Sequence, residues 1–156
     1  MDTRTPRTRR TPAHAPARTA RWAVAAALWS LLYVASKVQY ALAGRLGVTG
    51  GPEVPDHAYA DFGPGEVAAA QWGNAGVGLG AALLFLLLSL PAARRVPRWL
   101  SLPPVGAVAL MMSAGAVGMV YRDLATGVGG TGFGLYCLVW AGLAAAVLVG
   151  LARRRP

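Results

Sequence analysis

Residues 67–93 read VAAAQWGNAGVGLGAALLFLLLSLPAA, 27 residues without one charged side chain. A helix rises about 1.5 Å per residue, so about 20 apolar residues cross the hydrocarbon core of a bilayer. Lipid offers no partner for free backbone groups, and the alternating ten-residue pattern of barrel strands is absent. This stretch therefore predicts a membrane-spanning helix.

Three other stretches have the length and composition of a span. They cover residues 22–44, which Lys37 interrupts, 99–121 and 133–152. The third span is expected to become helical at Pro103 or Pro104, because proline suits a first helical turn. With 55% hydrophobic and 13% charged residues, the chain is predicted to be all-α, an integral membrane four-helix bundle over residues 22–152.

The charges predict how the chain threads the membrane. Twelve of the 15 basic residues lie before the first span, between the second and third, and after the fourth, whereas five of the six acidic residues lie in the other two connections. Because basic residues favour the cytoplasmic side, both termini are expected there. Lys37 is the only lysine, and arginine with alanine-rich spans suggests a high-GC bacterial genome. The expected location is a bacterial cell membrane, with multiple spans.

The segments outside the spans are expected to differ in order. Residues 1–21 have the composition of a disordered basic cytoplasmic tail, and residues 153–156 form a second basic tail. The net charge of +9 is interpreted as contact with anionic lipid headgroups and not with nucleic acid, since each arginine cluster adjoins an apolar stretch. Residues 45–66 are predicted to form an external loop, ordered or floppy, whose glycines and prolines prevent a helix.

Small residues four apart favour close approach of helices in a membrane. Gly76 and Gly80 have this spacing in the second span, and Ala114 and Gly118 have it in the third. We interpret these pairs as packing seams within the bundle; the alternative is a homodimer interface. The protein partner expected for the chain is a second copy or another membrane protein.

A group of polar residues is predicted near the outer side. Lys37 lies seven residues before Gly44, about 10 Å deep, so its ammonium either reaches the headgroups or turns inward to another helix. Gln71 and Asn74 share a helix face at a similar depth, where they either fix helix register or line an outward pocket with Lys37. Glu66 could supply a counter-charge, whereas Arg122 and Asp123 are expected to be an interfacial pair that could also contribute to the pocket.

Neither a cofactor nor a metal is expected. The loop residues Glu53, Asp56, His57, Asp61 and Glu66 lack the spacing of a metal motif, and we interpret them as a solvated acidic loop. Catalytic motifs such as a nucleophile elbow are absent. The expected function is a non-enzymatic accessory or interaction protein. The alternative is binding or transport of a small molecule or ion through a pocket of Lys37, Gln71, Asn74 and Glu66.

Three short motifs carry a resemblance to a known group. Tyr40, Ala41, Leu42 and Gly44 end the first span, Gly63, Pro64 and Gly65 open the second, and Tyr136 with Cys137 begins the fourth. In layout the chain resembles the small four-span membrane proteins of high-GC Gram-positive bacteria that are grouped as a domain of unknown function. The resemblance covers most of residues 22–152, although the third span lacks the polar residues of that group. It implies the architecture and no site residues.

Overall fold

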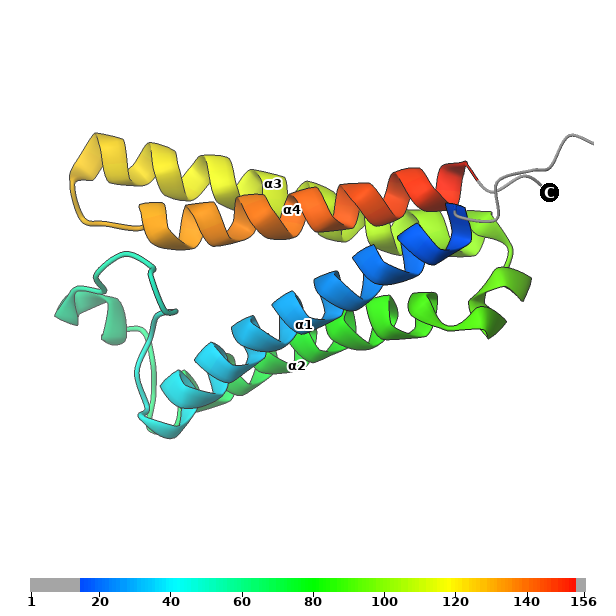
Figure 1. Cartoon of the computed structure of the whole chain (residues 1–156). Coiled ribbons are helices and arrows are strands. Elements are labelled where there is room, and N and C mark those ends of the chain that lie inside the picture. Colours follow the sequence, from blue (N-terminus) through cyan, green and yellow to red (C-terminus); the bar gives the residue numbers. More distant parts are fainter. Residues whose placement is uncertain (1–14, 154–156) are drawn as a thin grey trace, which may run out of the picture.

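The chain is all-α, as predicted. The computed structural model describes residues 15–153, which form four long helices and two short 3-10 helices (Figure 1). The long helices are α1 (Ala15–Leu42), α2 (Glu66–Ser89), α3 (Arg98–Thr126) and α4 (Thr131–Ala152), and the short ones are η1 (Asp56–Tyr59) and η2 (Pro91–Arg95). Three of the long helices, α2, α3 and α4, are long and apolar enough to cross a membrane.

The helices pack as two antiparallel pairs, α1 with α2 and α3 with α4. The pairs meet mainly between α1 and α4, at the end where α1 begins and α4 ends. Small residues allow this approach: Ala23 and Ala26 are fully buried in one core cluster with Ala144 and Val147. Toward the opposite end α1 diverges from α4, and the 43–65 loop lies in the widening space (Figure 1).

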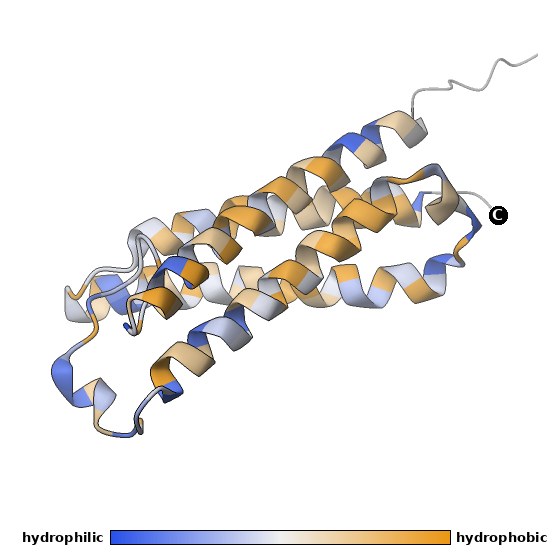
Figure 2. Cartoon of the chain, turned by 90° about the horizontal axis from the view of Figure 1, so that it is seen from below, coloured by the Kyte–Doolittle hydropathy of each residue, from blue (hydrophilic) through white to orange (hydrophobic). Residues whose placement is uncertain are grey.

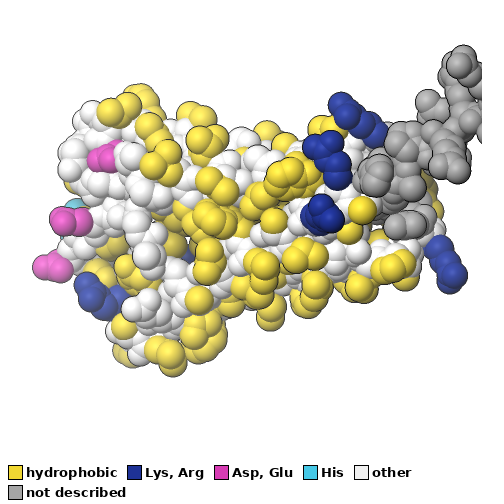
Figure 3. Space-filling model, in the orientation of Figure 1, with side chains coloured by type: hydrophobic (Ala, Val, Ile, Leu, Met, Phe, Trp, Pro, Cys, Tyr) yellow, Lys and Arg dark blue, Asp and Glu magenta, His cyan; other side chains and the backbone are white. Residues whose placement is uncertain are grey.

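Charged and apolar side chains are segregated along the helices. Figure 2 shows hydrophobic residues along the middle of the helices and strongly hydrophilic ones toward their ends and in the loops. On the face in Figure 3, basic side chains gather near the ends of the chain, and acidic side chains lie at the loop end, where a basic side chain is also visible. Large apolar side chains between the two ends are exposed, for example Val77 at 62% and Leu110 at 73%. Water-soluble proteins rarely expose so much apolar surface.

Two predicted helix starts are wrong. The described part of the predicted disordered tail, residues 15–21, is helical, because α1 continues along the end of α4 and Thr19 packs against Gly150, which has no side chain to obstruct it. Residues 1–14 and 154–156 of the predicted tails lie outside the described part. Helix α3 starts at Arg98, so Pro103 and Pro104 lie inside it, where they remove the N–H donors that would pair with the carbonyls of Trp99 and Leu100.

The predicted packing seams do not lie between helices of this chain. A Cβ atom added at Gly76, Gly80 or Gly118 would meet nothing within 4 Å, and Ala114 is exposed. The glycines at close approaches are others: a Cβ at Gly78 would lie 2.7 Å from Cδ1 of Tyr33, and one at Gly134 would lie 3.3 Å from the Ala116 carbonyl. The assignment of the four residues to seams within the bundle was therefore wrong, because spacing alone does not give the rotation of a helix about its axis.

Candidate functional site

Buried polar side chains of α1 and α2 converge on the backbone of the 43–65 loop. Lys37 is 8% exposed, and its Nζ donates a hydrogen bond of 2.8 Å to the Gly47 carbonyl. Gln71 is 2% exposed, and its Nε2 donates to the same carbonyl at 3.1 Å and to the Arg45 carbonyl at 2.9 Å. We call Lys37, Gln71 and the carbonyls of Arg45 and Gly47 the loop anchor. It binds the start of the loop to both helices of the first pair.

The ammonium of Lys37 also lies 5.5 Å from the ring centroid of Tyr33, one turn earlier on α1. An aromatic face attracts a cation within this range. The side chain is thus turned into the structure, and its partners are a loop carbonyl and a ring.

Further hydrogen bonds attach the loop to both helix pairs. The Thr49 amide donates to Ser36 Oγ at 2.9 Å, and the two hydroxyls lie within hydrogen-bond distance of each other. The Phe133 amide at the start of α4 donates to the Gly50 carbonyl at 2.7 Å, and the Glu53 amide donates to the Val128 carbonyl at 3.0 Å. Gly50 has a φ of +72°, and a Cβ there would lie 3.3 Å from the backbone of Gly132 and Phe133. The loop, whose order the sequence left open, is therefore ordered and docked on α4.

The other predicted pocket residues lie elsewhere. Asn74 is exposed on α2, and Glu66 is exposed and accepts a hydrogen bond from the Gly63 amide at 2.8 Å. Asp123 binds the α3–α4 connection instead of pairing with Arg122: it accepts from the amides of Gly129 and Thr131 and from the Thr131 hydroxyl. The structure brings Lys37 and Gln71 together and leaves Asn74, Glu66, Arg122 and Asp123 apart from them.

An aromatic cluster joins α1 to α4 below the loop. Its members are Trp29, Tyr33, Phe133, Tyr136 and Trp140. The rings of Trp29 and Tyr136 stack with centroids 5.0 Å apart, Trp29 Nε1 donates to the Tyr136 carbonyl at 3.2 Å, and the Tyr136 hydroxyl donates to the Trp29 carbonyl. These reciprocal bonds hold the helices together where they begin to separate. This cluster was not predicted from the sequence, although four of its aromatic residues lie at helical spacing on two predicted spans, Trp29 with Tyr33 and Tyr136 with Trp140.

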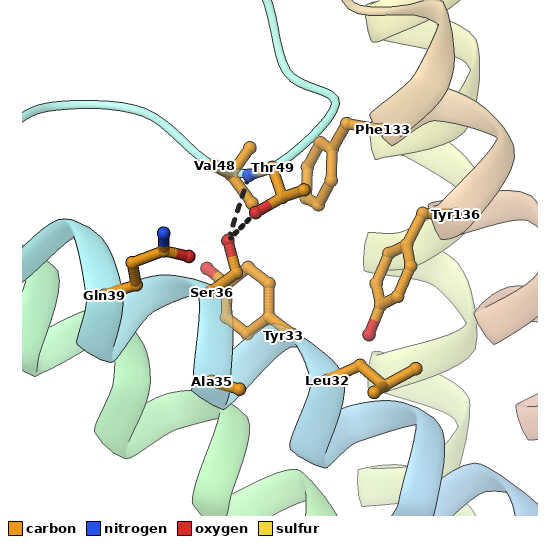
Figure 4. A pocket seen from close by; sticks show the side chains of 9 residues that line it. All are labelled: Leu32, Tyr33, Ala35, Ser36, Gln39, Val48, Thr49, Phe133 and Tyr136. Carbon is orange, nitrogen blue, oxygen red and sulfur yellow. Dashed lines mark hydrogen bonds between the residues drawn. The ribbon is translucent and has the colours of Figure 1, made fainter.

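A cavity of about 360 Å³ lies between this cluster and the loop (Figure 4). Figure 4 shows Tyr33, Ser36 and Gln39 of α1 on one side, Phe133 and Tyr136 of α4 on the other, and Val48 and Thr49 above. A second cavity, of about 390 Å³, is lined by Tyr40, Tyr59 and loop residues 45–48 and 50–54. None of the four residues proposed as an outward pocket lines either cavity.

The acidic loop has no arrangement suited to a metal ion. Within residues 15–153, no three His, Cys, Asp or Glu side chains gather closely enough to hold one.

Comparison with known proteins adds no assignment. No protein-family model, no curated protein and no solved structure matches the chain.

Proposed function

We propose that this protein is a multi-pass protein of a bacterial cell membrane, with α1 as a fourth span and both termini in the cytoplasm. It acts as a non-enzymatic accessory or interaction protein that presents an ordered loop outside the cell. The inward position of Lys37 is the observation that carries this proposal. Because the ammonium binds the Gly47 carbonyl and lies against the Tyr33 ring, the costly charge does not face lipid. The outer surface of α1 then consists of apolar side chains such as Leu28 and Leu32, which are 60% and 56% exposed.

The charge distribution supports the orientation. Arg18, Arg21, Arg95, Arg98 and Arg153 lie at the end of the bundle where α1 begins and α4 ends. Glu53, Asp56, Asp61 and Glu66 lie in or beside the opposite loop. The arginine-rich end fits the cytoplasmic leaflet, where anionic lipids attract basic side chains.

The structure favours the accessory function over the alternative of an ion or solute pathway. The two buried polar side chains that could line such a path, Lys37 and Gln71, instead bind loop carbonyls. Exposed carboxylates, among them Asp56 and Asp61, give the loop a surface that could interact with a partner outside the cell.

Cysteine labelling in intact cells tests the threading. Cys137, the only native cysteine, is 1% exposed, so a membrane-impermeant maleimide should leave the unaltered chain unlabelled. We expect Asp61→Cys to be labelled in intact cells and Arg153→Cys only after permeabilisation. Labelling of both from outside would refute the topology, and purification of the intact chain as a monodisperse particle without detergent would refute the membrane location.

A further inference from the structure

The cavity between α1 and α4 is covered by loop residues Val48 and Thr49, which we call its roof, and is open on one side. The loop closes its outer end, because the Gly50–Phe133 bond carries Val48 and Thr49 across the space. Tyr136, whose ring stacks against Trp29, lines the part of the cavity away from the loop. Three of its lining residues, Leu32, Ala35 and Gln39, are exposed and follow one face of α1. The cavity therefore opens sideways between the helices, on the face that the proposed membrane location places in hydrocarbon.

Its lining changes from polar to apolar with depth. Gln39 lies three residues before the end of α1 and Leu32 ten residues before it, so they are about 5 Å and 15 Å from that end. Ser36 and Thr49 add hydroxyls near the roof, whereas Leu32 and the rings of Phe133 and Tyr136 line the rest. A phospholipid of the outer leaflet has the same order, with ester carbonyls toward the headgroups and methylenes deeper.

We propose that this cavity binds one acyl chain of an outer-leaflet phospholipid. The chain lies against Phe133 and Tyr136, and the Gln39 amide donates a hydrogen bond to an ester carbonyl of the lipid. The volume of about 360 Å³ is at the lower end of the range for small-molecule sites, which suits part of one chain and not a whole lipid. No charged side chain lines the cavity, so binding is expected to be independent of headgroup charge. This inference rests on the proposed membrane location.

Native mass spectrometry of the full chain, released from detergent micelles, tests the proposal. The probes are palmitoyl-oleoyl phosphatidylcholine and the matching phosphatidylglycerol. We expect one lipid of either kind to survive collisional activation that removes the others. Ala35→Phe, which fills the cavity from α1, should lose this lipid. Ala70→Phe, at an exposed position near the outer end of α2, is the matched control and should retain it.

A melting curve in lipid-free detergent shows whether each variant folds. If Ala35→Phe does not fold, Leu32→Trp replaces it, because Leu32 lines the cavity and is 56% exposed. Added phospholipid should raise the melting temperature of the unaltered chain and of Ala70→Phe, and not that of the cavity-filling variant.

Equal lipid retention in the unaltered chain and the cavity-filling variant would overturn the proposal, as would retention of phosphatidylglycerol alone. Stabilisation by a short-chain quinone without any by phospholipid would also overturn it, since a different ligand would then occupy the site. These outcomes leave the cysteine-labelling result unaffected, so failure of this inference is distinguishable from failure of the proposed membrane location.

Discussion

Lys37 shows how this chain accommodates a charge inside an apolar helix. A buried cation without partners is strongly unfavourable in a medium of low dielectric constant. Here the ammonium binds a carbonyl at 2.8 Å and lies 5.5 Å from an aromatic ring centroid. The same hydrogen bond holds the Gly47 backbone at the loop end of α1 and α2. One interaction therefore both stabilises the buried ammonium and docks the loop.

Gln71→Leu should lower the free energy of unfolding by about 0.5–1.5 kcal/mol, the net contribution of a typical hydrogen bond, because Arg45 is exposed and water can reach its carbonyl. The substitution removes the donor to the Arg45 carbonyl, while Gly47 retains the bond from Lys37. Asn74→Leu is the matched control on the same helix; because Asn74 is exposed, it should change stability by less than about 0.5 kcal/mol. Denaturation by SDS titration in mixed micelles measures both. Equal effects of the two substitutions would contradict a specific role for Gln71.

Lys37 and Gln71 should also be coupled, since they donate to the same Gly47 carbonyl. In the single variants Lys37→Met and Gln71→Leu, the Gly47 carbonyl still accepts a hydrogen bond from the remaining side chain. In the double variant it accepts from neither side chain. The loss of stability in the double variant should therefore exceed the sum of the single losses, by at least about 0.5 kcal/mol. Additive losses in the same SDS titration would show that the two side chains act independently.

At the scale of single helices, glycine has two different roles that a spacing pattern does not distinguish. Gly78 and Gly134 lie where another element comes close to the helix, and Gly80 and Gly142 face open space on the same two helices. The open positions are free for lipid or for a second protein, which keeps the alternative of an interface with another chain open for Gly76 and Gly80.

Each of these two helices thus offers a matched pair of glycines, Gly78 with Gly80 on α2 and Gly134 with Gly142 on α4. Alanine should destabilise the protein at the close-contact glycine of each pair and not at the open one. A Cβ at Gly78 would meet the Tyr33 ring, which the aromatic cluster holds in place, and one at Gly134 would meet the Val120 side chain at 2.9 Å and the Ala116 backbone. Gly78→Ala and Gly134→Ala should each cost about 1–3 kcal/mol through overpacking. Gly80→Ala and Gly142→Ala should be neutral or stabilising by up to about 1 kcal/mol, because alanine favours the helix. Melting temperatures of the four purified variants give the comparison, and a loss at Gly80 equal to that at Gly78 would contradict a rotation of α2 that turns Gly78 toward Tyr33 and Gly80 away from the other helices.

At the scale of the whole molecule, the loop completes the contact between two helix pairs that diverge. The pairs meet directly where α1 begins, and at the other end the loop connects them through Ser36, Gly50 and Glu53. The cavity follows from this arrangement, because the loop crosses the space without filling it.

Hydrogen exchange measured on the whole protein should show a protected loop. The amides of Thr49, Glu53 and Phe133, which donate to Ser36, Val128 and Gly50, should exchange slowly. The amide of exposed Asp61 should exchange faster. Ser36→Ala should speed exchange at Thr49 because it removes the acceptor. Exchange at Thr49 and Glu53 as fast as at Asp61 would show that the loop does not dock.

The helical class follows from the sequence alone. Long uncharged stretches such as 67–93 can satisfy their backbone groups only as helices if lipid surrounds them, and α2, α3 and α4 match the predicted stretches to within a few residues at most ends. The start of α1 was missed, since residues 15–21 gain their stability from packing against the end of α4, and local composition does not record that contact.

Only the tertiary structure decided which polar and small residues meet. Lys37 and Gln71 could be recognised as unusual from their positions in apolar helices, but their partner is the backbone of Gly47, and a carbonyl carries no signature in a sequence. The glycine contacts and the cavity likewise depend on how each helix is rotated about its axis and on how far α1 diverges from α4. An apolar helix in lipid can adopt many such rotations, so its sequence does not specify one. Side-chain composition therefore determined the helices, and the shapes of the packed surfaces decided which residues form the loop anchor and the cavity.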